Sequence, residues 1–95
     1  MKKTYTPAPL DTSDVKLMSD LIELTELLAE NVHENWATQK IAQGWHFGEN
    51  LDDKLKTTPL LVPYENLTDD FKFYDRQTAM QTLKTILKLG FKISR

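Results

Sequence analysis

The sequence predicts a mainly α fold in which two long antiparallel helices are joined by a long, ordered, irregular connector. Apolar residues recur at three- and four-residue steps in two stretches, and a glycine follows each stretch. Between these stretches, the segment 45–67 follows neither a helical nor a strand pattern. A chain of 95 residues has room for one hydrophobic core, so we assign residues 1–95 to a single domain.

Residues 1–16 predict an extended arm. Pro7 and Pro9 interrupt any regular pattern, and the arm ends in a turn-like polar segment at residues 11–14. Three apolar side chains would allow the arm to pack against the helices, namely Tyr5, Leu10 and Val15.

The first helix is predicted over residues 19–43. Ser19 suits the N-cap position, and Asp20 and Glu23 suit the positive end of the helix dipole. One apolar stripe at helical spacing carries Leu17, Leu21, Leu24, Leu28, Val32 and Trp36. Gly44 follows as a residue that accepts the left-handed conformation of a helix cap.

The second helix is predicted over residues 69–89, with Thr68 as its N-cap and Gly90 as its closing residue. Its apolar face consists of Phe71, Tyr74, Met80, Leu83, Ile86 and Leu87. The tail, residues 90–95, begins with the alternating segment 91–93, which predicts either a short strand or a packed tail.

An antiparallel pair of these helices agrees with the distribution of charge. Acidic residues dominate residues 11–34 and basic residues dominate residues 84–95, so the pairing brings opposite charges together. Two helices cannot cover both of each other's apolar faces. We therefore expect either the arm and connector, or a second copy of the chain, to cover the remainder.

The connector, residues 45–67, is predicted to be ordered despite its irregular pattern. It contains too many apolar groups to leave in water: Trp45, Phe47, Leu51, Leu55, Leu60, Leu61, Val62 and Tyr64. Pro59 and Pro63 lower the entropy that is lost on ordering. Irregular backbone leaves peptide groups outside regular ladders, where they can contribute to a ligand site.

Composition narrows the class of protein. A formal net charge of −2 argues against a nucleic-acid-binding protein, for which a basic domain is expected. No apolar stretch is long enough to span a bilayer, and the first residues lack the apolar stretch of a secretory signal. Cysteine is absent, so disulfides and thiolate chemistry are excluded. We expect a cytoplasmic protein that binds neither nucleic acid nor membrane.

No motif predicts catalysis, and we expect neither a metal nor a cofactor. His33 and His46 are the only histidines, and the helical spacing of a zinc-binding pair is missing. We expect His33 to form a hydrogen bond with the backbone of the connector. Adjacent carboxylates at 52–53 and at 69–70 diverge and do not form a facing acid–base pair. The sequence therefore does not predict an enzyme.

Tryptophan, proline, glycine and charged residues recur at particular spacings over about residues 5–93. They form the segments 31–36 (NVHENW), 44–48 (GWHFG), 59–64 (PLLVPY), 74–76 (YDR) and 83–91 (LKTILKLGF), with Asp52, Asp53 and Lys56 between them. Together these motifs resemble the ryanodine receptor repeat, or RyR domain. On this resemblance the chain is identified as a single-copy, stand-alone and prokaryotic member of that family.

The resemblance implies a helix, an irregular loop with short β segments and a second helix. Repeats of this family associate in pairs about a pseudo-twofold axis, which for a single copy implies a homodimer. Channel activity is not implied, because the chain has no pore helix. The resemblance also implies a sensor of nucleotide-like ligands. Its matching positions here are Trp36, Trp45, Asp53, Lys56, Tyr64 and Arg76.

Each of these residues also has a structural interpretation. Trp45 either stacks on a purine or fixes the connector to the helix pair, and Trp36 fits core packing. Lys56 and Arg76 either bind phosphate or pair with Asp52, Asp53 or Asp75. Two functions remain open: a non-enzymatic module that binds an adenine-nucleotide-like ligand, and a structural module that acts through homodimerisation.

Overall fold

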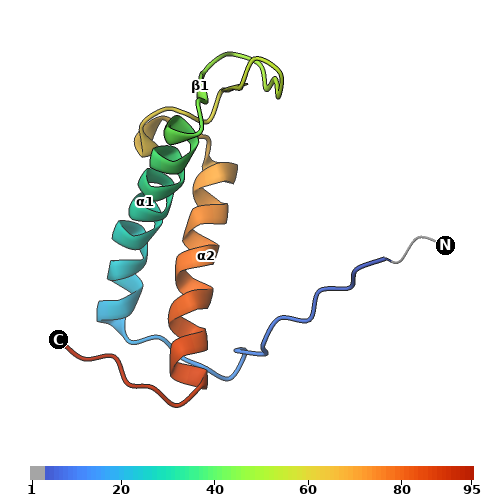
Figure 1. Cartoon of the computed structure of the whole chain (residues 1–95). Coiled ribbons are helices and arrows are strands. Elements are labelled where there is room, and N and C mark those ends of the chain that lie inside the picture. The colour runs from blue at the N-terminus through green and yellow to red at the C-terminus, as the bar shows by residue number, and fades with distance from the viewer. Residues whose placement is uncertain (1–3) are drawn as a thin grey trace.

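The structure, a computed structural model, describes residues 4–95. Two long helices, α1 (Ser19–Ala42) and α2 (Asp69–Lys88), run antiparallel along each other's length (Figure 1). Between them lie two short strands, β1 (His46–Phe47) and β2 (Thr57–Thr58), and a 3₁₀ turn, η1 (Tyr64–Asn66). The predicted mainly α fold with short β segments is confirmed.

Both helices are closed by the predicted glycines, and each ends one residue earlier than expected, at Ala42 and Lys88. Gly44 has φ 93° and Gly90 has φ 96°, a region that a side chain disfavours. The amide of Trp45 donates to the carbonyl of Lys40, and that of Phe91 donates to Ile86, at 2.9 and 3.2 Å. These bonds close both helices in the Schellman arrangement.

The helix starts differ from the expected caps. Met18, and not Ser19, occupies the N-cap position of α1, because its backbone is extended and its carbonyl accepts hydrogen bonds from Leu21 and Ile22. Thr68 does occupy the N-cap position of α2. Neither N-cap side chain, Met18 or Thr68, forms a capping hydrogen bond, so tertiary packing rather than capping fixes where the helices start.

The contact between the helices is built mainly from small and polar side chains, with one leucine. Thr25, Ala29 and His33 of α1 are buried, and so are Ala79 and Leu83 of α2. Small side chains allow the helix backbones to approach closely. At the connector end of the bundle, the core is completed by Leu60, Val62, Tyr64 and Leu67, which pack with Ala29.

The arm covers less of the bundle than the sequence suggests. Residues 4–10 are all exposed, and in Figure 1 this segment extends away from the helices. Only the last part of the arm is attached. The Thr12 hydroxyl donates to Gln81 at 2.9 Å, and Lys88 forms an ion pair with Asp14 at 2.9 Å. That ion pair joins the acidic and basic regions as expected. Residues 1–3 of the predicted arm lie outside the described residues.

The connector divides into two parts. Its second part packs on the helices, but its first part projects beyond them as a loop (Figure 1), and there Phe47, Leu51 and Leu55 are 53%, 69% and 67% exposed. The expectation that the whole connector buries its apolar groups is therefore wrong for these residues. Local hydrogen bonds hold the loop instead.

The β1 and β2 strands pair in parallel, with His46 opposite Thr57 and Phe47 opposite Thr58. The Asp52 carboxylate accepts hydrogen bonds from the amides of Lys54 and Leu55 at 2.9 and 3.0 Å.

The tail forms no strand over residues 91–95, so of the two alternatives for this segment the strand is wrong.

Candidate functional site

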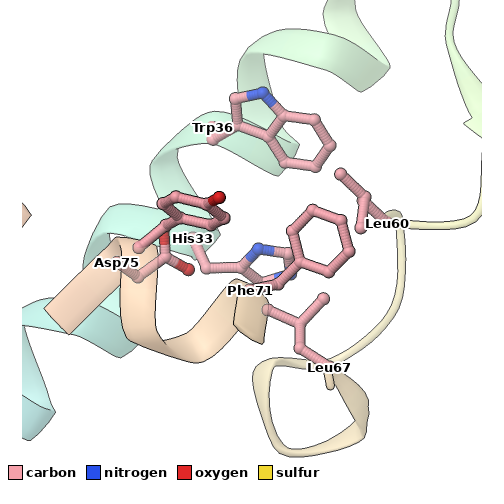
Figure 2. A pocket seen from close by; sticks show the side chains of 7 residues that line it. His33, Trp36, Leu60, Leu67, Phe71 and Asp75 are labelled. Carbon is pink, nitrogen blue, oxygen red and sulfur yellow. The ribbon is translucent and has the colours of Figure 1, made fainter. Parts of the chain in front are cut away.

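A cavity of about 170 Å³ lies where the connector meets the two helices. Three segments contribute its walls: His33 and Trp36 of α1, Leu60 and Leu67 of the connector, and Phe71, Tyr74 and Asp75 of α2. Figure 2 shows the rings of Trp36 and Phe71 and the carboxylate of Asp75 bordering the same space. The lining is therefore aromatic and aliphatic with three titratable groups, those of His33, Tyr74 and Asp75.

Helical spacing explains why these side chains meet. His33 and Trp36 are three residues apart on α1, so they lie on one face. Phe71, Tyr74 and Asp75 have the i, i+3, i+4 spacing at the start of α2. The antiparallel pairing brings the second half of α1 beside the first turns of α2, so the two faces oppose each other.

His33 is fixed in one orientation. Its side chain is 4% exposed, and its Nε2–H donates to the carbonyl of Val62 at 2.7 Å. A carbonyl can only accept, so the proton lies on Nε2. The His33 ring also stacks on Trp36, with 5.7 Å between ring centroids. The predicted hydrogen bond from His33 to the connector backbone is confirmed, and it positions the indole of Trp36 as well.

Asp75 is the acidic group of the cavity. Burial raises the pKa of its carboxyl, and the proximity of His33 opposes that shift. The ion pairs formed within residues 4–95 join Arg76 to Glu26 and Lys88 to Asp14, so Asp75 forms no ion pair with a lysine or arginine in this part of the chain. A partly desolvated carboxylate in an aromatic cavity favours a ligand that carries a positive charge or donates hydrogen bonds.

A second polar cluster centres on Glu26. The Arg76 guanidinium donates to the Glu26 carboxylate through two nitrogens at 2.6 and 3.0 Å, and the Tyr64 hydroxyl donates to it at 3.1 Å. The Arg76 bond lowers the pKa of Glu26, while burial and the Glu26 contact raise the pKa of Tyr64. Lys72 Nζ lies 5.7 Å from the Tyr64 ring centroid. This cluster joins α1, η1 and α2.

The partner expected for Arg76 is therefore wrong. The sequence suggested Asp52, Asp53 or Asp75, but Glu26 of the opposite helix is in place across the bundle. The same three carboxylates were expected for Lys56, whose Nζ instead donates to the backbone carbonyl of Gln43 at 2.9 Å. The local sequence could not show either pairing, because both depend on how distant segments pack.

The remaining predicted site residues lie near the end of α1 and in the projecting loop. Trp45 is partly buried, with Lys40 Nζ 4.8 Å from its ring centroid, which agrees with a role in fixing the connector. Asp53 is exposed in the turn of residues 53–56. Of the six predicted site residues, the structure places only Trp36 in the cavity lining, and it places Tyr64 and Arg76 together on Glu26.

Sequence reasoning missed Phe71, Tyr74 and Asp75 as site residues. The available signal was their common face at the start of the second helix, together with the His33–Trp36 spacing. Periodicity identified Phe71 and Tyr74 as part of an apolar face but could not show that they line a cavity.

Two further findings concern metal ions and membranes. Over residues 4–95 there is no group of three or more histidine, aspartate or glutamate side chains placed to hold a metal ion. In the same part of the chain, neither helix is long and apolar enough to cross a membrane.

Comparison with protein families gives one match that covers nearly the whole chain. The family model of the RyR domain matches residues 5–95. The matched region includes both helices, the connector and every residue that lines the cavity. The resemblance seen in the sequence motifs is confirmed at the level of the family.

Proposed function

Since the chain belongs to the RyR domain family, we propose that it is a non-enzymatic binding module that takes one ring of a nucleotide-like small ligand into the cavity between α1, α2 and the connector. The observation that supports this proposal best is the cavity lining. Trp36, Phe71 and Tyr74 supply three aromatic side chains from two different helices. Aromatic side chains stack on nucleobases of any sequence, because every base has a π face.

The size of the cavity suits a single ring. A dry apolar cavity of about 150 Å³ in a protein accommodates one benzene molecule, and this cavity measures about 170 Å³. A whole nucleotide needs more space than that, since sites for drug-sized ligands span about 300–1,000 Å³. The ring therefore enters, and the sugar and phosphates remain outside the cavity.

Binding without reaction is part of the proposal. Nε2 of His33 is engaged with the Val62 carbonyl, and the other polar groups of the lining are the Asp75 carboxylate, the Tyr74 hydroxyl and the Trp36 indole N–H. No serine, threonine or lysine that could act as a nucleophile lines the cavity. We place this module in the cytoplasm, where nucleotide-like ligands are available to it.

A ligand screen with matched tryptophan variants tests this function. Thermal-shift and calorimetric titrations would use adenine nucleotides, ADP-ribose, cyclic nucleotides and nicotinamide nucleotides at up to millimolar concentration. We expect binding to weaken at least about fivefold in Trp36→Leu and to stay within about twofold in Trp45→Leu, because stacking is worth about 1–3 kcal/mol per base. Binding by none of these ligands, or equal binding by the Trp36→Leu variant, would overturn the proposal.

A second candidate, an interaction module that acts through homodimerisation, is favoured by a separate observation. A groove of about 470 Å³ lies between the first half of α1 and the tail, residues 93–95. In its lining, Met18 is 73% exposed and Leu27 is 65% exposed. Apolar surface of this kind along α1 and the tail would be covered by a second copy.

Sedimentation analysis over a hundredfold range of concentration tests the second candidate. A dimer formed through the groove predicts dissociation in Leu27→Lys but not in Ile41→Lys, since Ile41 is similarly exposed, at 62%, and lies outside the groove. A monomer at all concentrations would rule this candidate out and leave the first one standing.

A further inference from the structure

The cavity has an unbalanced charge. Its lining includes one carboxylate, Asp75, and no lysine or arginine. The two basic residues nearest in sequence, Lys72 and Arg76, lie on the Tyr64–Glu26 side of α2, where Lys72 approaches the Tyr64 ring and Arg76 bonds to Glu26. A negatively charged group placed in the cavity would face Asp75 with no lysine or arginine of the lining to offset the repulsion, so a phosphate is disfavoured there.

The aromatic side chains also favour a positively charged ligand. The face of an aromatic ring carries partial negative charge, so it attracts a cation within about 6 Å, most strongly over tryptophan. Trp36, Phe71 and Tyr74 offer three such rings around one space that also contains Asp75. Aromatic rings combined with a carboxylate are the arrangement expected for binding an organic cation.

We propose, on the basis that the cavity is a ring-binding site as argued above, that it selects a positively charged six-membered nitrogen heterocycle of the pyridinium type over a neutral ring of the same shape. Such a ring stacks on the indole of Trp36 and places its positive charge toward the Asp75 carboxylate. The cavity volume of about 170 Å³ admits one such ring.

Two features of the cavity favour a flat cationic ring over a compact quaternary ammonium ion. Leu60 and Leu67 close one side of the cavity in Figure 2, and they offer apolar contact to the edge of a ring. His33 stacks on Trp36 with an interplanar angle of 24°, and this contact fixes the orientation of the indole in the cavity wall. Flat contact on an indole gives a planar cation more buried area than a spherical one.

The carboxylate gains from this occupant. Burial raises the pKa of the Asp75 carboxyl because desolvation penalises the charged form, and the nearby His33 only opposes that shift. A permanent cation stabilises the charged form of the Asp75 carboxyl, whereas a neutral ring does not. Asp75 is therefore the residue that discriminates between the two ligands, and Trp36 is the residue that binds both.

The test uses matched ligands that differ mainly in charge. 1-Methylnicotinamide is a permanent cation, nicotinamide is its neutral counterpart, and tetramethylammonium is a cation without a ring. Each is titrated at pH 7 into the whole protein while the two indole N–H signals are followed by nuclear magnetic resonance, with Trp45→Phe assigning the signal of Trp36. We expect 1-methylnicotinamide to bind at least tenfold more tightly than nicotinamide, and to shift the signal of Trp36 rather than that of Trp45.

Matched aspartate variants locate the discrimination. Asp75→Asn keeps the shape of the side chain and should reduce the preference for the cation to within about twofold, while nicotinamide binding stays unchanged. Asp53→Asn is the control, since Asp53 is exposed in the projecting loop, and should keep the full preference. Far-ultraviolet circular dichroism of each variant establishes that it is folded.

The outcomes separate this inference from the function on which it rests. Equal binding of 1-methylnicotinamide and nicotinamide, or an unchanged preference in Asp75→Asn, would overturn the charge selection and leave a ring-binding module. Tetramethylammonium binding as tightly as 1-methylnicotinamide would overturn the requirement for a ring. If no ring ligand, charged or neutral, shifts the Trp36 signal, both the inference and the proposed function fail.

Discussion

His33 of α1 donates a hydrogen bond from Nε2 to the carbonyl of Val62 at 2.7 Å, and this bond ties the connector to the helix pair. The two residues are far apart in the sequence, and His33 is buried. On one side the bond orients the ring that stacks on Trp36, and on the other it seats the chain that contributes Leu60 and Leu67 to the cavity. The cavity thus depends on this contact for both its indole and its connector wall.

Replacement of His33 by alanine should destabilise the fold. It leaves the Val62 carbonyl without its partner and removes a buried ring, so we expect a loss of about 1–3 kcal/mol in the free energy of unfolding. His46→Ala is the control, because His46 is exposed in β1, and it should change stability by less than about 0.5 kcal/mol. Urea denaturation measures both, and equal stability of the two variants would show that the His33 bond contributes nothing.

Stability should fall in acid through the Glu26 cluster. The folded-state pKa of Glu26 lies below its ordinary value of 4.5 because Arg76 bonds to the carboxylate. The ionised group therefore stabilises the folded chain above pH 4.5, and this contribution is lost as the pH falls through the lower, folded-state pKa. The melting temperature of wild type should exceed that of Glu26→Gln at pH 7 and converge with it in acid. A difference that is constant from pH 7 to pH 3 would contradict this assignment.

Asp75 should behave in the opposite way. Its pKa is raised by burial, so ionisation is less favourable in the folded state than in the unfolded state. The carboxylate thus opposes folding at pH values above its folded-state pKa, and the penalty disappears as the pH falls below its ordinary value of 3.8. We expect Asp75→Asn to raise the melting temperature at pH 7 and to lose that advantage in acid.

A gain of stability on removing Asp75 would be the pattern of a group kept for function, as the proposed role in ligand binding requires. Scanning calorimetry of Asp75→Asn and Asp53→Asn across the same pH range checks this prediction. A lower melting temperature for Asp75→Asn at pH 7 would mean that Asp75 has a stabilising partner, and the argument for an unpaired carboxylate would fail.

The projecting loop depends on Gly48. A Cβ at this position would lie 2.5 Å from the Cβ of Thr57, so alanine forces β1 and β2 apart. We expect Gly48→Ala to speed amide exchange at His46, whose N–H bonds to Lys56, and at Thr57, whose N–H bonds to Asp52. The cavity that Trp36 lines should keep its ligand affinity, because the connector residues in its wall, Leu60 and Leu67, belong to the second part of the connector. Unchanged exchange at both amides would show that the pairing is not maintained by close approach at Gly48.

How far the sequence predicts the structure follows from the range of the interactions. Helix extents depend on local periodicity and on Gly44 and Gly90, and they are predicted to within one residue at their ends. The N-cap at Met18 is missed because packing fixes that start rather than a side-chain hydrogen bond. The family is correctly identified because its motifs are spread over the whole chain.

The candidate site is harder to predict because it is assembled from segments distant in the sequence. Trp36 is placed in the cavity, but Arg76 and Tyr64 are drawn to Glu26, a residue whose importance appears only when the two helices are side by side. Phe71 and Tyr74 read as ordinary members of an apolar helix face until the connector leaves an opening beside them. Long-range pairing of side chains, rather than residue type, decides which residues share a site.

A crystal structure of the protein with 1-methylnicotinamide tests the central claim most directly. We predict the ring in the cavity formed by α1, α2 and the connector, flat against the indole of Trp36 and with its charged nitrogen facing Asp75. A ring stacked on Trp45 instead, with the side chains of Phe71 and Tyr74 filling the cavity themselves, would contradict the account.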